Sequence, residues 1–165
     1  MVIYTIGHST HPAEVLLKLL TAHGIEVVAD VRSRPYSRYN PQFNRDALKN
    51  LLLEAGIRYL YLGRELGGRP QDLDRPLADE VVWEHLRSRP QFREGLRRLL
   101  EEASLARVCL LCAEADPAHC HRGQLLSPEL EARGAQVQHI LADGTLLEHH
   151  DVKMPIKKPS QKRLF

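Results

Sequence analysis

Short apolar runs alternate along the chain with longer stretches in which apolar residues recur every three or four positions. The short runs, rich in β-branched and aromatic residues, predict strands within 2–9, 26–33, 58–63, 106–114 and 137–143. The periodic stretches predict helices over 12–23, 45–55, 79–103 and 120–133, the third of them broken near Pro90. Residues 65–76 are rich in Gly, Pro, Asp and Arg, which is typical of an irregular loop.

This alternation of strand and helix favours an α/β fold with a mostly parallel sheet. We therefore expect one three-layer, Rossmann-like α/β domain over residues 1–148, with about five strands. Residues 149–165 contain two prolines and little periodicity, and we expect them to form a basic, extended or disordered C-terminal tail. The length of 165 residues suits about one domain.

Charge separates the expected domain from the tail. Residues 1–150 carry 18 basic and 20 acidic side chains, whereas residues 151–165 carry five basic side chains and one acidic side chain. No apolar run approaches the ~20 residues of a membrane span, and no basic leader precedes an apolar stretch, so we expect a cytoplasmic protein without membrane contact. Three cysteines do not suggest a disulfide framework.

Ionisable and hydroxyl side chains gather directly after the predicted strands. Because the carboxyl ends of parallel strands meet at one edge of a sheet, these side chains are expected to share a site. In strand order they are His8 and Ser9; Asp30, Arg32 and Arg34; Glu65 and Arg69; and Glu114, Cys120, His121 and Arg122.

This set suggests an enzyme that hydrolyses or transfers a group of a phosphorylated, nucleotide-like or nucleic-acid substrate. Cys120 or a carboxylate-activated water attacks, His8 or His121 moves protons, and Asp30, Glu65 and Glu114 are candidate acids or bases. Arginine forks bind phosphate groups, and we expect Ser9, Arg32, Arg34, Arg69 and Arg122 to bind the anion. The sequence does not identify a cofactor.

The three cysteines differ in their predicted settings. Cys109 and Cys112 lie three apart in one strand and therefore point to opposite faces, so Cys109 is expected to be a buried apolar residue. Cys120 lies near the start of the next predicted helix, where backbone N–H groups and Arg122 lower a thiol pKa.

Two alternatives to a nucleophilic Cys120 stay open. Cys112, Cys120 and His121, with His8 or His119, are a possible zinc ligand set, although their spacing matches no standard template. Cys120 could instead pack inward while His121 and Arg122 bind carbonyls or carboxylates. The remaining histidines, His139 and His149 among them, are expected to be surface or core residues.

Residues 31–45 interleave arginines with aromatic side chains, among them Tyr36, Arg38 and Tyr39. Aromatic rings stack on bases, so these residues suggest contact with a nucleotide or a single-stranded nucleic acid. The alternative function is a non-catalytic nucleic-acid-binding or repair accessory module. The structural alternative is an ion network in which the arginines pair with carboxylates, namely Asp30, Glu65, Asp72, Asp74 and Glu114.

Five segments carry a resemblance to a known family. They are TIGHS (5–9), DVRSRPYS (30–37), NPQFN (40–44), YLYLGRELGGRP (59–70) and LLCAEADPAHCHR (110–122). In these segments the chain resembles the family catalogued as domain of unknown function 488. The resemblance implies an α/β fold with a site drawn from these segments, and it implies no particular activity.

The last five residues, QKRLF, are similar to the short peptide by which bacterial replication and repair proteins dock on the sliding clamp. Leu164 and Phe165 are adjacent apolar anchors for a pocket, and Gln161 can form hydrogen bonds at its rim. The sliding clamp is therefore an expected partner of the tail. The alternative is an apolar terminus that folds back onto the domain.

Overall fold

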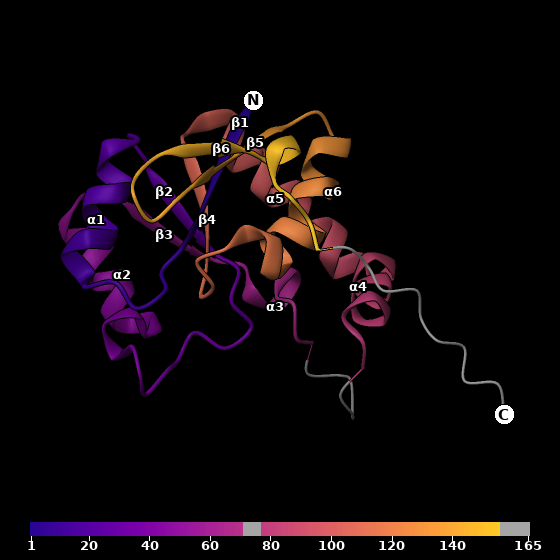
Figure 1. Ribbon diagram of the computed structural model, residues 1–165, viewed down its shortest axis with the longest axis horizontal. Coiled ribbons are helices and arrows are strands. Elements are labelled where there is room, and N and C mark those ends of the chain that lie inside the picture. Colours follow the sequence, from indigo (N-terminus) through magenta and orange to yellow (C-terminus); the bar gives the residue numbers. More distant parts are fainter. Residues whose placement is uncertain (71–76, 156–165) are drawn as a thin grey trace, which may run out of the picture.

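The computed structural model describes residues 1–70 and 77–155, and within them the strands form one six-stranded sheet (Figure 1). Its strands are β1 (Val2–Gly7), β2 (Val27–Asp30), β3 (Arg58–Tyr61), β4 (Val108–Cys112), β5 (Gln136–Ile140) and β6 (Leu146–Glu148). Their order across the sheet is β3-β2-β4-β1-β5-β6. The first five strands are parallel and β6 is antiparallel to β5. The expected mainly parallel α/β sheet is confirmed, with β6 as an additional edge strand.

Helices cover both faces of the sheet, which gives the expected three layers (Figure 1). One face is covered by α1 (Ala13–Ala22) and α2 (Arg45–Glu54). The other carries α3 (Gly63–Leu66), α4 (Asp79–Ser88), α5 (Pro90–Leu105) and α6 (Ser127–Ala132). The break near Pro90 separates α4 from α5, because proline suits the first turn of a new helix.

The central strand β4 contributes side chains to both apolar cores. Val108, Leu110 and Cys112 face the helices α3 to α6, whereas Cys109 and Leu111 face α1 and α2. This alternation confirms that the two cysteines of β4 point to opposite faces. Burial raises the pKa of the Cys109 thiol, which is the behaviour of an apolar core residue.

The switch point of the sheet lies between β1 and β4. From β1 the chain crosses one face through α1, and from β4 it crosses the opposite face through α6. The two strands are in register, with Gly7 beside Cys112. The hydrogen bonding continues past the ends of the two strands. The backbone N–H of His8 donates to the carbonyl of Cys112, and that of Ser9 to the carbonyl of Ala113, both at 2.9 Å. Ligands of open α/β sheets bind at such a point.

Two segments differ from the expected loop and tail. Gly63–Leu66 form a short helix, so the irregular segment does not begin at residue 65. His149–Asp151, at the expected start of the tail, form a 3-10 turn in which His149 is buried. None of the helices in the described parts of the chain combines the length and apolar character that a bilayer crossing requires.

Gly7 is the point of closest approach between β1 and the loop that follows β4. A Cβ atom at this position would lie 1.7 Å from the carbonyl oxygen of Glu114. We expect Gly7→Ala to lower the free energy of unfolding by about 1–3 kcal/mol, because the loop must move away. Thr10→Ala, an exposed position in the next loop, should change it by less than about 0.5 kcal/mol. Urea denaturation measures both, and a Gly7→Ala protein as stable as the wild type contradicts the prediction.

Candidate functional site

Two thiols meet at the switch point. Cys112 is the last residue of β4, and Cys120 follows the 3-10 turn Pro117–His119. Asp116 caps this turn by accepting a hydrogen bond from the backbone N–H of Ala118 at 2.9 Å. The turn brings the chain back to the strand, and the sulfur atoms of Cys112 and Cys120 lie 2.9 Å apart.

Arg122 fills the space beneath the two thiols and is fully buried. Its Nη1 donates to the sulfur of Cys112 at 2.8 Å and to that of Cys120 at 3.3 Å. Nη1 also donates to the carbonyl of Glu114 at 2.7 Å, and Nη2 to that of Ala115 at 3.1 Å. The guanidinium thus fixes the loop and brings a positive charge to both sulfurs.

The pKa values of the two thiols are shifted in opposite directions. Burial and the hydrogen bond with Cys120 raise the pKa of Cys112 well above its usual value. Burial alone would also raise the pKa of Cys120, but hydrogen bonds with Cys112 and His121 and the charge of Arg122 lower it to about 3. These opposite shifts favour the negative charge on Cys120 and the proton on Cys112.

A buried chain of hydrogen bonds runs from Arg122 to Thr5 of β1, then to His139 of β5 and on to His149. Its Nε donates to Thr5 Oγ1 at 3.0 Å, and the same hydroxyl shares a hydrogen bond of 2.6 Å with His139 Nδ1. On its other side, His139 Nε2 shares a hydrogen bond of 3.0 Å with His149 Nδ1. Burial and the charge of Arg122 lower the pKa of His139 to about 3, which keeps this ring neutral.

This chain of hydrogen bonds was not predicted from the sequence. His139 and His149 were expected to be surface or core histidines, and both are buried, but Thr5 was assigned no role. Each of the three is unremarkable in its own segment, and only the pairing of β1 with β5 brings Thr5 and His139 together. A polar residue at a buried position of β5 was the one available signal.

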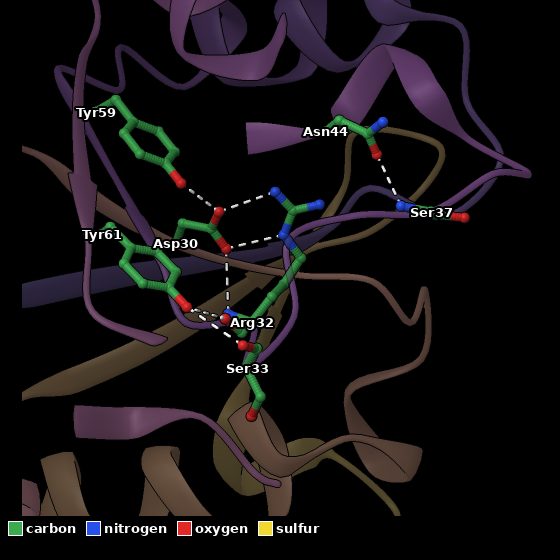
Figure 2. Close-up of polar contacts among 7 residues, drawn as sticks. All are labelled: Asp30, Arg32, Ser33, Ser37, Asn44, Tyr59 and Tyr61. Atoms are coloured by element: carbon green, nitrogen blue, oxygen red, sulfur yellow. Dashed lines mark hydrogen bonds and ion pairs between the residues drawn. The ribbon is translucent and has the colours of Figure 1, made fainter. Parts of the chain in front are cut away.

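A second buried ion pair stands at the end of β2 (Figure 2). Asp30 accepts hydrogen bonds from Arg32 Nε at 2.9 Å, from Arg32 Nη2 at 2.8 Å and from the Tyr59 hydroxyl at 2.6 Å. The backbone N–H of Arg32 adds a fourth bond at 3.1 Å. With no exposed surface and four donors, Asp30 is placed to position Arg32. Tyr61 donates to the carbonyls of Arg32 and Ser33, which fixes the exit of β2.

His8 is buried at the exit of β1. Its Nδ1 lies 2.8 Å from the carbonyl oxygen of Ser9, and its ring packs on Phe43 with centroids 4.7 Å apart. A carbonyl can only accept, so Nδ1 carries the proton and Nε2 is left as an acceptor. Burial lowers the pKa of His8 to about 4, so the ring is neutral at pH 7. Ser9 has a left-handed backbone, with φ of 48°.

Three adjoining cavities bring most of the expected residues together. The first, of about 360 Å³, is lined by Cys112 and Cys120 together with Arg32, Arg34, Arg69, Glu114 and His121. The second, of about 300 Å³, is lined by His8, Ser9, Arg32, Arg34, Tyr36 and Glu114. The third, of about 830 Å³, is lined by Arg34, Tyr36, Arg45, Arg64, Glu65 and Arg69, among others. Arg34 lines all three.

Hydrogen bonds join the loops that carry these residues. Ser33 Oγ accepts from the backbone N–H of Arg69 at 2.9 Å, which ties the segment after β3 to the exit of β2. His121 Nε2 lies 3.1 Å from the carbonyl oxygen of Val31, which ties the segment after β4 to the same exit. Asn44 Oδ1 accepts from the backbone N–H of Ser37 at 2.7 Å (Figure 2).

The expected ion network is present only in part. Arg32 pairs with Asp30, but Arg34, Arg64 and Arg69 have no carboxylate partner among the residues that the structure describes. Asp72 and Asp74 lie outside the described residues.

Glu65 contacts none of the cavity arginines closely. Its Oε1 lies 3.7 Å from Nη1 of Arg98, and its buried Oε2 has no hydrogen-bond partner in the described part of the chain. Arg45 stacks over the ring of Tyr61 at 4.4 Å. Within the described residues, Arg34, Arg64 and Arg69 therefore form no direct ion pair, although the carboxylates of Asp79 and Glu114 line the thiol cavity and that of Glu65 lines the cavity of about 830 Å³.

The remaining expected residues lie elsewhere. Arg38 and Tyr39 are exposed beyond the cavities described above, with the Arg38 guanidinium 6.0 Å from the Tyr39 ring. Gln161, Leu164 and Phe165 lie outside the described residues, so clamp docking stays a prediction.

A metal ion fits the thiol pair poorly. Potential ligand atoms of Cys112, Glu114 and Cys120 lie within 4.8 Å of one another, while His121, expected as a ligand, is turned towards Val31. Two thiolates on a tetrahedral zinc ion are about 3.8 Å apart, given a Zn–S bond of about 2.3 Å. Here the sulfurs are closer, and the Arg122 cation already contacts both. His119 pairs instead with Asp116 at 3.0 Å.

Among known proteins, the family described as "Domain of unknown function DUF488" matches residues 12–127. No curated protein and no solved structure matches the chain. The matched range contains both thiols, Arg122 and the Asp30–Arg32 pair, whereas Thr5, His8 and His139 lie outside it.

The neutral His139 makes folding stability depend on pH. Its pKa of about 3 lies below the unfolded value near 6.5, so the unfolded chain binds this proton more readily and stability falls as the pH drops below about 6.5. His8 and Cys120, whose pKa values are also lowered, act in the same direction.

We therefore expect the wild type to lose about 2 kcal/mol more than His139→Gln between about pH 7.5 and pH 5. The glutamine amide can accept from Thr5 and donate to His149 but does not titrate in this range. Urea denaturation at several pH values measures the difference, and parallel pH profiles for the two proteins refute it.

Proposed function

The chain belongs to the family of domains of unknown function DUF488, and from the geometry of its thiol site we propose an enzyme of hydrolysis or group transfer. The substrate is anionic, either phosphorylated, nucleotide-like or a nucleic acid, and the nucleophile is the Cys120 thiolate. The observation that carries this proposal is the Cys120 sulfur in the wall of an arginine-lined cavity, where it accepts hydrogen bonds from Arg122.

Support for the nucleophile comes from the donors around Cys120. Its sulfur accepts hydrogen bonds from Nη1 and from the backbone N–H of Arg122, both at 3.3 Å. Thiolates, not thiols, are the attacking species of cysteine enzymes. Arg122 has no exposed surface, so we assign its charge to the thiolate and not, as the sequence suggested, to the substrate.

Support for an anionic substrate comes from the cavity arginines. Arg34 and Arg69 line both the thiol cavity and the cavity of about 830 Å³, and neither has a carboxylate partner among the described residues. Nη1 of Arg32 likewise lacks a hydrogen-bond partner there, since the bonds to Asp30 use Nε and Nη2. Guanidinium forks bind phosphate oxygens in pairs. A cavity of this size accepts a nucleotide-sized molecule, and exposed Tyr36 offers a ring for stacking.

The proposed reaction has two steps. The Cys120 thiolate attacks the electrophilic phosphorus or carbonyl carbon of the bound substrate. The bond to the leaving oxygen breaks as that oxygen takes a proton from Nδ1 of His121, whose Nε2 donates to the carbonyl of Val31. Water or an acceptor hydroxyl then attacks the sulfur-linked group and gives its proton to Glu114, whose carboxylate lies within 4.8 Å of both sulfurs. The bond to sulfur breaks and the thiolate returns, and Glu114 then gives its proton through solvent back to His121, which restores both groups.

A non-catalytic nucleic-acid-binding module is the second candidate. It is favoured by Tyr36 and Tyr39, whose exposed fractions are 64% and 84%, in the same loop as Arg38. Exposed aromatic rings beside arginines bind single strands by stacking and by charge. This candidate predicts that the protein binds single-stranded nucleic acid without converting it.

Calorimetry with inorganic phosphate, nucleoside mono- and diphosphates and a short single-stranded oligonucleotide tests the first proposal. We expect Arg34→Ala to weaken binding of the preferred anion at least about tenfold, because a charged hydrogen bond is worth about 1.5–3 kcal/mol. Arg93→Ala is the matched control, because Arg93 is exposed on α5 away from the cavities. Cys120→Ser should keep the binding and lose turnover of the bound compound by at least about 10³-fold.

Two outcomes contradict the enzyme. One is anion binding that Arg34→Ala and Arg93→Ala leave equally strong. The other is full turnover by Cys120→Ser. Loss of oligonucleotide binding in Arg38→Ala and Tyr39→Ala, with no turnover of any compound by the wild type, supports the binding module instead.

A further inference from the structure

The proposed function uses Cys120 but gives no role to the thiol beside it. Cys112 is 1% exposed, and its sulfur lies 2.9 Å from that of Cys120. Burial raises the pKa of its thiol. Neither sulfur is bonded to the other. A second thiol in contact with a thiolate is the arrangement in which an oxidised sulfur is captured by its neighbour.

We infer that Cys120 and Cys112 form a reversible dithiol–disulfide couple, in which a hydroperoxide oxidises Cys120 and Cys112 then resolves the oxidised sulfur. This inference shares the Cys120 thiolate with the proposed function but does not depend on the arginine-lined cavities or on any anionic substrate.

The positions of the two sulfurs decide which one attacks the peroxide and which one resolves the oxidised sulfur. Both sulfurs lie in the wall of the 360 Å³ cavity, through which a small oxidant can enter. Cys120 is the more exposed of the two and carries the negative charge, so it is the sulfur that attacks. Cys112 lies deeper, at the end of β4, and reaches the oxidised sulfur from the side of the protein core.

The first step breaks the peroxide bond. The Cys120 thiolate attacks one oxygen of the hydroperoxide, the O–O bond breaks, and Cys120 becomes a sulfenic acid. The other oxygen leaves with the electron pair and takes a proton from solvent as an alcohol or water. In the second step the Cys112 sulfur attacks the Cys120 sulfur, the S–O bond breaks, and the hydroxide takes the Cys112 proton as water. An external dithiol then reduces the disulfide.

Arg122 supports both steps because it contacts both sulfurs. In the reduced pair, the charge of Cys120 and the hydrogen bond with it contribute to the raised pKa of Cys112. Conversion of Cys120 to a neutral sulfenic acid removes that charge. The guanidinium, whose Nη1 is closer to Cys112 (2.8 Å) than to Cys120 (3.3 Å), then favours a thiolate at Cys112.

The geometry of the loop allows the bond to form. A disulfide needs a sulfur separation of about 2.0 Å, so the two atoms must approach by only about 1 Å.

Cys109 is the built-in control, because it faces the core of α1 and α2 on the opposite side of the sheet. Oxidation also removes the nucleophile of the proposed reaction, so peroxide should suppress that activity wherever it is found.

The test treats the full-length protein with a slight excess of hydrogen peroxide and maps its cysteines by mass spectrometry. Trypsin releases all three in one peptide, residues 108–122, and cleavage after Glu114 then separates Cys112 from Cys120 unless a disulfide joins them. We expect the joined fragments from the oxidised wild type, their separation on reduction, and an unmodified thiol at Cys109.

Variants assign the individual steps. In Cys112→Ser the sulfenic acid cannot be resolved, so dimedone labelling of Cys120 should rise at least about tenfold over the wild type. Cys120→Ser should give neither product, and Cys109→Ser should behave as the wild type. Circular dichroism confirms that each variant is folded.

Wild-type protein that forms no Cys112–Cys120 link while its Cys120 becomes labelled overturns the inference. Equal dimedone labelling of the wild type and Cys112→Ser also overturns it. Neither result depends on anion binding or turnover, so failure of this inference and failure of the proposed enzyme are separate outcomes.

Discussion

A fully buried guanidinium has to be surrounded by acceptors and balanced by negative charge, and Arg122 meets both needs within the loop that follows β4. Two loop carbonyls, one threonine hydroxyl and two sulfurs surround it. The Cys120 sulfur lies 3.3 Å from its Nη1, so the cation and a thiolate at Cys120 stabilise each other. Close backbone packing makes this possible, since Cβ atoms at Gly7 and Gly123 would lie under 2 Å from backbone carbonyl oxygens.

The two buried arginines at this edge of the sheet are held differently. The guanidinium of Arg122 is turned into the protein and acts on the thiols. The guanidinium of Arg32 is held on one side by Asp30, with Tyr59 as a further donor to the carboxylate, and its other side lines the cavities (Figure 2). Arg122 is thus placed to lower the pKa of the nucleophilic thiol, and Arg32 is placed to contact a ligand in the cavity.

The sequence predicted the features that depend on local pattern. Apolar periodicity located the main helices and the five parallel strands, and side-chain alternation along β4 placed Cys109 and Cys112 on opposite faces. It also predicted that the polar residues after the strands share one edge. The short strand β6 and the four-residue helix α3 were not predicted, because their patterns are too short to stand out. Neither was the role of Thr5 and His139, which are 134 positions apart and meet only through strand pairing.

The proposed reaction and the proposed oxidation both require a charged sulfur at Cys120 in the resting protein. Cysteine labelled with ¹³C at Cβ reports the ionisation of each thiol by its chemical shift, and Cys109→Ser and Cys120→Ser assign the signals. With a pKa of about 3, Cys120 should remain a thiolate from neutral pH down to about pH 5, while Cys112 stays protonated throughout. A Cys120 signal that titrates near the ordinary thiol value of about 9 would contradict the account.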